Sequence, residues 1–373
     1  MKNLDTDVVI IGSGVIGLSI AYFLSKEGKK VILLEKEKNF GMGSSSRNTE
    51  VIHAGVYYAK DSLKSKLCLI GKKMMYDFCT KNSIPHKKIG KLFIALNSEQ
   101  VTYLEKIKLQ AEANGLKDLK YLNKNEILEI EPALRCDMAI LSPSSGIVDS
   151  YSFMQSLLRF SQDKGVIFSA NSPFLGADFN SNFWKVYVGG KNTTELKCKI
   201  IINASGLNAT EISNKVKSNK QIPLPNPIKG IYLRYSGKSP INHIVYPSLI
   251  PGKIEERVDA TPDLNNVLRF GPSVEKEKIS NVDDYSANSE IKNRFSPQIK
   301  KYLPKLDVDK LHLDLVGIRP KVIMKNNIVP DFMFEWGSKQ GWLDLWNMES
   351  PGLTASLAIG DYVNNKIIKS RLI

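Results

Sequence analysis

Three glycines near the N-terminus have the spacing of a nucleotide-binding turn. Gly12, Gly14 and Gly17 form the pattern G-x-G-x-x-G directly after the apolar run Val8–Ile11. The first glycine suits a tight turn, the second lets the backbone approach a pyrophosphate, and the third lets the next helix pack closely on the strand. The free N–H groups at the start of that helix would face the phosphates. The spacing predicts that this turn binds a dinucleotide.

The elements around this turn agree with that prediction. An amphipathic segment, Val15 to Ser25, is stopped by Gly28, and a second apolar run, Val31–Leu34, ends in Glu35. Strand, glycine turn, helix, strand and acid together make a complete βαβ unit, in which Glu35 would accept hydrogen bonds from a ribose diol. An acid there argues against a 2′-phosphate, so the unit favours NAD or FAD over NADP and leaves those two open.

A glycine- and serine-rich loop follows the second strand. It runs from Lys36 to Asn48 and contains the letters NFGMGSSSRN. Loops at the carboxyl ends of strands in an open α/β sheet are placed to contact a bound dinucleotide. The alternative is a flexible surface turn.

The composition is that of a globular protein with room for two domains. The chain has 373 residues, of which 42% are hydrophobic and 24% are charged. We find no export signal and no apolar run near the roughly 20 residues of a membrane span, so we expect a cytoplasmic protein, with peripheral contact at the inner membrane surface left open. Four cysteines without paired spacing and four histidines predict reduced thiols and no metal site.

The net charge of +14 is spread along the chain. Its lysines do not alternate with aromatic residues in one block, so we expect no nucleic-acid partner. A mild attraction to anionic substrates or lipid surfaces is compatible with this charge.

The order of elements suggests a dinucleotide domain that is built from separated segments. The proline-rich stretch Gln221–Pro227 marks a crossing between domains. After it come short predicted strands of a mainly antiparallel sheet, at Ile228–Tyr235, His243–Tyr246, Arg257–Thr261 and Val267–Phe270. The remaining predicted elements include a strand at Leu196–Ala204 and helices at Ser62–Asn82, Ser98–Asn114, Lys124–Ile130, Ser150–Lys164, Val282–Leu303 and Leu353–Asn364. A return to strand, glycine and helix at the C-terminus implies that the antiparallel part is an insertion.

Several segments resemble one known family. They are DVVIIGSGVIGLSIAYFLS, SSSRNTEVIHAGVYY, LKSKLCLIGKKMMYDFC, GKLFIA, NASGL, GIRPK and MESPGLTASLAIGDYV. These segments are similar to those of the L-2-hydroxyglutarate dehydrogenases and oxidases, FAD enzymes of the D-amino-acid-oxidase-like, glycine-oxidase-like superfamily. The resemblance runs from Asp7 to Val363 and implies FAD in the first site.

The resemblance also implies a fold and its division. It implies a mixed α/β chain with a Rossmann-like FAD-binding domain of glutathione-reductase type and an inserted, mainly antiparallel substrate domain. We predict residues 1–88, 143–222 and 314–373 for the first domain, and residues 89–142 and 223–313 for the second. Residues 166–174 would pass the adenine. The predicted FAD-binding residues are Gly12, Gly14, Gly17, Glu35, Lys36, Ser44, Ser45, Ser46, Arg47, Asn48, Ala204, Gly206, Gly352, Leu353 and Thr354.

Oxidation of a 2-hydroxy acid by FAD needs a base for the hydroxyl proton and cations for the carboxylates. Histidine suits a base near pH 7, and His53 follows the serine-rich loop, although it could instead only shape the flavin pocket. Arg319 is the first candidate for a substrate carboxylate, since arginine binds carboxylates bidentately. Lys321, Tyr58 and Arg269 are further candidates for substrate binding.

One position departs from the family pattern. Where relatives carry a histidine shortly before a threonine, this chain has Asp259 before Thr261. A carboxylate in the pocket would repel a dicarboxylate and favour an amine, whereas a carboxylate at the rim would be harmless.

The leading hypothesis is therefore an FAD-dependent oxidoreductase that oxidises L-2-hydroxyglutarate or a close analogue to the 2-oxo acid by hydride transfer to flavin N5. Its electron acceptor would be a quinone, a carrier protein or oxygen. The alternatives are an amino-acid or amine oxidase of the same superfamily and a non-catalytic FAD-binding protein.

Overall fold

A six-stranded sheet forms the base of the nucleotide-binding half. The computed structural model describes residues 4–218, 221–250, 256–275, 279 and 281–373. In the order β22-β23-β13-β1-β2-β9, this sheet pairs its strands in parallel except at β22, which is antiparallel to its neighbour. The strands are β1 (Val8–Ile11), β2 (Val31–Leu34), β9 (Ile167–Ser169), β13 (Ile200–Asn203), β22 (Met333–Trp336) and β23 (Trp342–Trp346).

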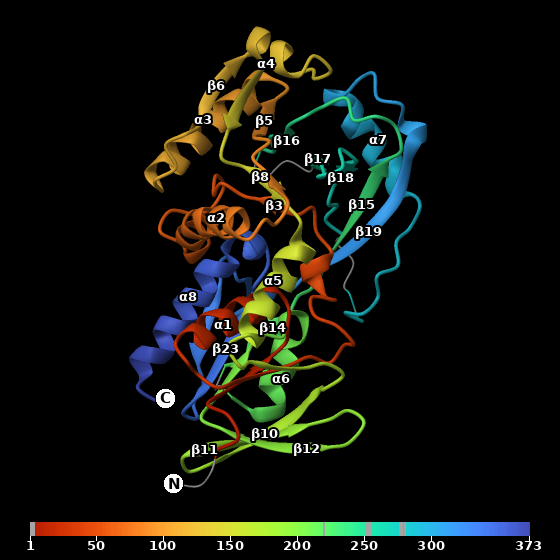
Figure 1. The fold of residues 1–373 in the computed structure, drawn as a ribbon. Helices are drawn as coiled ribbons and strands as arrows, with labels where there is room; N and C mark the ends of the chain where they lie inside the picture. The colour runs from red at the N-terminus through yellow and green to blue at the C-terminus, as the bar shows by residue number, and fades with distance from the viewer. Residues whose placement is uncertain (1–3, 219–220, 251–255, 276–278, 280) are drawn as a thin grey trace.

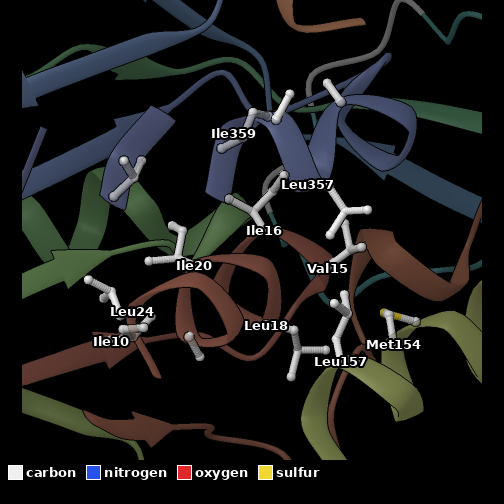
Figure 2. Packing of buried hydrophobic residues seen from close by; sticks show 14 of the residues in the cluster. Ile10, Val15, Ile16, Leu18, Ile20, Leu24, Met154, Leu157, Leu357 and Ile359 are labelled. Carbon is white, nitrogen blue, oxygen red and sulfur yellow. The ribbon is translucent and has the colours of Figure 1, made fainter. Parts of the chain in front are cut away.

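Both faces of this sheet are buried, which is why its central strands are continuously apolar. Val8 and Ile10 of β1 belong to one core cluster, and Val9 and Ile11 belong to another on the opposite face. Helices α1 (Val15–Lys26), α2 (Leu63–Lys81), α5 (Ser150–Gln162) and α8 (Gly352–Ser370) cover the first face, and Figure 2 shows apolar side chains of α1, α5 and α8 packed together. The opposite face is covered by α6 (Ala209–Val216) and by a three-stranded sheet of β10 (Phe174–Asn180), β11 (Phe183–Val188) and β12 (Thr194–Cys198).

Two glycines allow the close approaches that bring the helices to this sheet. A Cβ on Gly17 would lie 2.0 Å from the carbonyl oxygen of Gly12, so α1 could not sit this close to the turn with any other residue there. A Cβ on Gly71 would lie 2.5 Å from the carbonyl oxygen of Thr354, where α2 crosses the start of α8.

An eight-stranded sheet, ordered β19-β15-β18-β17-β16-β5-β7-β6, forms the second half. All its neighbours pair antiparallel except β16 and β5. Its strands are β5 (Lys91–Ala95), β6 (Lys120–Asn123), β7 (Met138–Ser142), β15 (Ile228–Tyr235), β16 (Ile244–Pro247), β17 (Ala260–Pro262), β18 (Leu268–Phe270) and β19 (Leu311–Arg319). Helices α3 (Ser98–Ala113), α4 (Lys124–Ile130) and α7 (Ile291–Tyr302) accompany it, and Figure 1 shows α3 and α4 at the opposite end of the molecule from β10–β12.

Short strands connect the two halves. One small sheet holds β3 (Val51–Ile52), β8 (Gly146–Val148) and β4 (His86–Lys87), and another holds β14 (Leu224–Pro225), β20 (Val322–Met324) and β21 (Asn327–Ile328). The strands of the eight-stranded sheet come from residues 91–142 and 228–319, so the predicted boundary at 314 falls inside β19. The exact division into domains stays a prediction.

Some predicted elements differ from the structure. The strand predicted at Leu196–Ala204 is two strands, β12 and β13, and β10 was not predicted. The helix predicted from Val282 begins only at Ile291, because Asp284 and Asn288 accept hydrogen bonds from backbone N–H groups two residues ahead and hold that stretch in turns. Over the described residues, the helices are too short or too polar to cross a bilayer.

Candidate active site

A cavity of about 1020 Å³ runs from the glycine-rich turn to the start of α8 and the end of β19. It is lined by side chains and backbone from both halves of the molecule. Twelve of the predicted cofactor positions line it: Gly12, Gly14, Glu35, Lys36, Ser44, Ser45, Arg47, Asn48, Ala204, Gly206, Gly352 and Leu353. Gly17, Ser46 and Thr354 are not among the lining residues, and Gly17 and Thr354 instead shape its walls through their contacts.

The glycine turn is held against the next parallel strand. Gly12 has φ +97°, and a Cβ there would lie 2.8 Å from the carbonyl oxygen of Ala204. Glu35 accepts hydrogen bonds from the Ser13 N–H (3.0 Å) and hydroxyl (2.7 Å), which fixes the acid at the edge of the turn. Its placement at the cavity wall agrees with contact to a ribose, and that contact remains a prediction.

The serine-rich loop is tied to both halves. Ser45 Oγ accepts a hydrogen bond from the N–H of Val15 at 3.0 Å, and Ser44 Oγ donates one to the carbonyl of Ile318 at 2.7 Å. The Arg47 guanidinium lies over the ring of Tyr285 at 3.8 Å, and its buried Nε has no hydrogen-bond partner among the described residues.

Other predicted loop contacts are internal to the protein. Lys36 Nζ lies 3.6 Å from Glu37 and 3.5 Å from Asp283, and the Asn48 amide donates to the carbonyl of Ser45 at 2.8 Å. These side chains hold the loop in place, while both residues still line the cavity.

His53 lies at the cavity wall with contacts to all its polar atoms. Its backbone N–H donates to Thr354 Oγ1 at 2.9 Å, its Nδ1 lies 3.3 Å from Lys91 Nζ, and its Nε2 lies 3.4 Å from Ser350 Oγ. Burial, together with Lys91 and Arg257, lowers the pKa of His53 well below its usual value. The imidazole is therefore neutral at pH 7, with one nitrogen free to accept a proton.

Lys91 was missed in the sequence analysis. It is 1% exposed, and its ammonium nitrogen lies 3.8 Å from the ring centre of Tyr246. Burial lowers its pKa to about 7, although Asp259 acts in the opposite direction. In the sequence, the feature that could have identified it is a lysine that begins the apolar run KLFIA. In the structure all five residues of this strand are buried.

Arg257 was missed as well, and it explains the departure at Asp259. Arg257 Nε lies 2.8 Å from Asp259 Oδ1, and both residues line the cavity. Burial raises the pKa of Asp259 to about 6, while Arg257 and Lys91 act to lower it. Asp259 therefore faces the pocket rather than its rim, and it does so next to a compensating guanidinium.

The predicted substrate residues divide into two groups. Arg319 and Tyr58 line the cavity, and the guanidinium of Arg319 contacts the carbonyl of Ser273 at 3.4 Å without an ion pair to any acid within the described parts of the chain. Lys321 lies outside the lining and contacts Glu349 at 2.6 Å.

The expectation that Arg269 points into the pocket is wrong. Its Nε lies 2.6 Å from Asp314, and Asp263 is 3.7 Å from its guanidinium, so both acids hold it outside the cavity. Alternation along the strand allowed Arg269 to lie on either face of the sheet. The two acids hold it on the face away from the cavity.

Comparison with known proteins places this geometry in a family. The family model described as FAD dependent oxidoreductase matches residues 7–365. The chain belongs to this family. The predicted fold class, the family and the FAD cofactor are thereby confirmed, and the protein acts on a small molecule together with an electron acceptor.

Three similar proteins illustrate the match. An L-2-hydroxyglutarate dehydrogenase of Arabidopsis thaliana is 34% identical, with 97% of this chain and 83% of the relative covered. A glycerol 3-phosphate dehydrogenase of Caloramator mitchellensis is 27% identical, with 96% and 72% covered. The structure of reduced L-alpha-glycerophosphate oxidase from Mycoplasma pneumoniae with FAD bound has a TM-score of 0.86 at 25% identity, with 95% and 93% covered.

The expectation of a cytoplasmic protein is contradicted by this comparison. The L-2-hydroxyglutarate dehydrogenases that match, including those of Nematostella vectensis and Caenorhabditis elegans, are named as mitochondrial proteins. The features on which that expectation was based, the lack of an export signal and of a long apolar run, do not identify the compartment.

The residues present fit FAD. The cavity is long enough to join the glycine turn to the start of α8, its turn has no side chain at Gly12 and Gly14, and Arg47 Nε lacks a partner within the described residues. The N-terminus of α8 at Gly352 opens on the same cavity and offers free N–H groups. Among the described residues, no group of His, Cys, Asp and Glu side chains could hold a metal ion.

Proposed function

We propose that this oxidoreductase oxidises a 2-hydroxy acid, L-2-hydroxyglutarate or a close analogue, to the 2-oxo acid. The observation that carries the proposal is that His53 and Arg319 line the same cavity as the glycine-rich turn. A base and a cation at one end of a dinucleotide cavity are the two groups that a hydroxy acid needs. The similarity to the Arabidopsis enzyme supports this choice of substrate.

In this proposal, His53 accepts the hydroxyl proton of the substrate. Its lowered pKa keeps the ring neutral at pH 7, so a lone pair is available on one nitrogen. When bound, FAD would supply the acceptor for the hydride that leaves C2, and a quinone, a carrier protein or oxygen would be the final electron acceptor.

Arg319 is proposed to bind a substrate carboxylate. It is a cation at the cavity wall whose hydrogen-bond partner is a neutral carbonyl, so its charge is available to a ligand. Asp259 does not favour an amine substrate, because Arg257 lies 2.8 Å from its carboxylate and offsets its charge. These contacts support the hydroxy acid over the alternative of an amino-acid oxidase.

An anaerobic titration of the FAD-loaded protein tests the proposal. The panel holds L- and D-2-hydroxyglutarate, shorter 2-hydroxy acids, amino acids and glycerol 3-phosphate, and the absorbance of FAD reports reduction. We expect L-2-hydroxyglutarate to bleach the flavin fastest. Bleaching by amino acids or glycerol 3-phosphate alone would reject this function, and no bleaching by any compound would favour a non-catalytic protein.

Two arginine variants test the carboxylate site. A hydrogen bond to a charged group contributes about 1.5–3 kcal/mol, so Arg319→Met should raise the substrate concentration for half-maximal reduction by roughly 10- to 150-fold. Arg269→Met is the matched control, because Arg269 is paired with Asp314 outside the cavity, and it should leave that concentration unchanged. Equal effects in both variants would show that Arg319 acts through the fold.

A further inference from the structure

Lys91 is a buried lysine that contacts a ring nitrogen of His53. Its Nζ is 3.3 Å from His53 Nδ1, and the residue is 1% exposed. It does not line the cavity, so it stands behind the imidazole and out of reach of a substrate. Whatever Lys91 does to the reaction, it does through His53.

The surroundings of Lys91 do not fix it as an ammonium ion. The charged or titratable groups that face it are His53, Cys68 on α2, Tyr246 on β16, and the pair Arg257 and Asp259 just before β17. Asp259 favours the ammonium form, but Arg257 lies 2.8 Å from that carboxylate and opposes it. Within the described chain Lys91 has no ion pair, and burial favours the neutral amine.

The protonation of Lys91 determines which nitrogen of His53 faces the substrate as an acceptor. An ammonium ion can only donate, so it requires a lone pair on Nδ1 and places the ring proton on Nε2. A neutral amine can accept the Nδ1–H, and this leaves the lone pair of Nε2 free. Only the second arrangement presents a base on the side of the ring where Ser350 Oγ lies, 3.4 Å from Nε2.

We propose that Lys91 is a positioning residue which, as a neutral amine, holds the proton of His53 on Nδ1 and so makes Nε2 the base. This inference rests on the proposed function of His53. In the reaction, Nε2 bonds to the hydroxyl proton as the O–H bond breaks, and the hydride with its two electrons leaves C2 for the acceptor already named. The proton on Nδ1 can then pass to Nζ, so that Lys91 and His53 together hold one extra proton until product leaves.

The first test reads the tautomer of His53 without any substrate. Nitrogen-15 NMR of the FAD-loaded full chain distinguishes Nδ1–H from Nε2–H, and the chain has only four histidines, so His53→Gln suffices for assignment. We expect the Nδ1–H form in the wild type at pH 9 and a change toward Nε2–H as the pH falls through about 7. Lys91→Met should lose this change, and Lys91→Arg, a permanent donor, should show Nε2–H at every pH.

The second test reads the rate. Anaerobic reduction by L-2-hydroxyglutarate should fall on the order of 10²-fold in Lys91→Met, with the rise in rate near pH 7 lost. Ethylamine should restore part of the rate in Lys91→Ala, which a merely structural role would not allow. Lys72→Met is the matched control, because Lys72 is a partly buried lysine that donates to Ser144 rather than to His53.

Two results would overturn the inference. One is an Nε2–H tautomer in the wild type at pH 9, and the other is a Lys91→Met variant with the wild-type tautomer, rate and pH profile. If Lys91→Met does not fold, Lys91→Arg carries both measurements. If no 2-hydroxy acid reduces the wild type, the proposed function fails, while the tautomer measurement still decides the role of Lys91.

Discussion

Replacing Lys91 by methionine should change how the stability of the protein depends on pH. A lysine in the unfolded chain has a pKa near 10.5, whereas burial lowers the pKa of Lys91 to about 7 in the folded protein. Between these two values the unfolded chain binds the proton and the folded protein does not. The buried lysine therefore lowers the free energy of unfolding. This penalty is greatest below pH 7, and it decreases as the pH rises from 7 toward 10.5.

The size of the effect follows from the two pKa values. With 1.36 kcal/mol for each pH unit of difference, Lys91 costs the fold about 4 kcal/mol at pH 7 and about 2 kcal/mol at pH 9. Methionine fills a similar volume and carries no charge, but it loses the hydrogen bond to His53, which is worth about 1 kcal/mol. The variant should be more stable than the wild type by about 3 kcal/mol at pH 7 and by about 1 kcal/mol at pH 9.

Urea unfolding of both proteins, saturated with FAD and followed by tryptophan fluorescence, measures this difference at pH 7, 8 and 9. Other groups that titrate in this range are common to both proteins and cancel in the comparison. Lys66→Met is the control, because the side chain of Lys66 is 59% exposed and its replacement should leave the pH dependence as it is. A stability difference that stays constant from pH 7 to pH 9 would refute the neutral amine on which the Lys91 argument rests.

Two further variants test the contacts at the start of α8. Gly71→Ala should lower the urea midpoint, because a Cβ 2.5 Å from the carbonyl oxygen of Thr354 costs about 1–3 kcal/mol by overpacking, against about 1 kcal/mol gained in helix propensity; an unchanged or higher midpoint would mean that α2 and α8 separate freely. Thr354→Val should destabilise by about 2–4 kcal/mol in the same assay, because it removes the hydroxyl that accepts from the N–H of His53 and donates to the carbonyl of Val51. Thr354→Ser keeps both bonds, and equal losses in the two variants would argue that packing of the methyl group matters more.

The βαβ unit could be predicted because its evidence is local. Apolar runs, glycine spacing and the terminal acid all lie within about thirty residues, and each has one physical role at its own position. The start of α8 was predicted within one residue for the same reason, since a proline and a glycine precede an apolar periodic segment. These features needed no knowledge of which distant segments meet.

The contacts behind His53 could not be predicted in this way. Lys91 begins β5 and His53 directly follows β3, 38 residues earlier in the chain, and the two side chains meet only in the folded protein. Arg257 comes from a third segment of the chain. The residues next to it in the sequence do not indicate whether this arginine is buried or exposed. The position of Arg269 could not be predicted either. Alternation along its strand allows two faces, and its acidic partners, one of them on β19, hold it on the face outside the cavity.

The departure at Asp259 gains a different meaning when these contacts are considered together. The cluster contains three groups that can be cationic, His53, Lys91 and Arg257, and Asp259 is the acid that faces them. Without that carboxylate, the charge of Arg257 would be uncompensated in a buried place and would lower the pKa of both neighbours further. Asp259 therefore supports the cluster that serves His53 more than it repels a substrate, and the carboxylate of a ligand is left to Arg319, whose guanidinium makes no ion pair in the described structure.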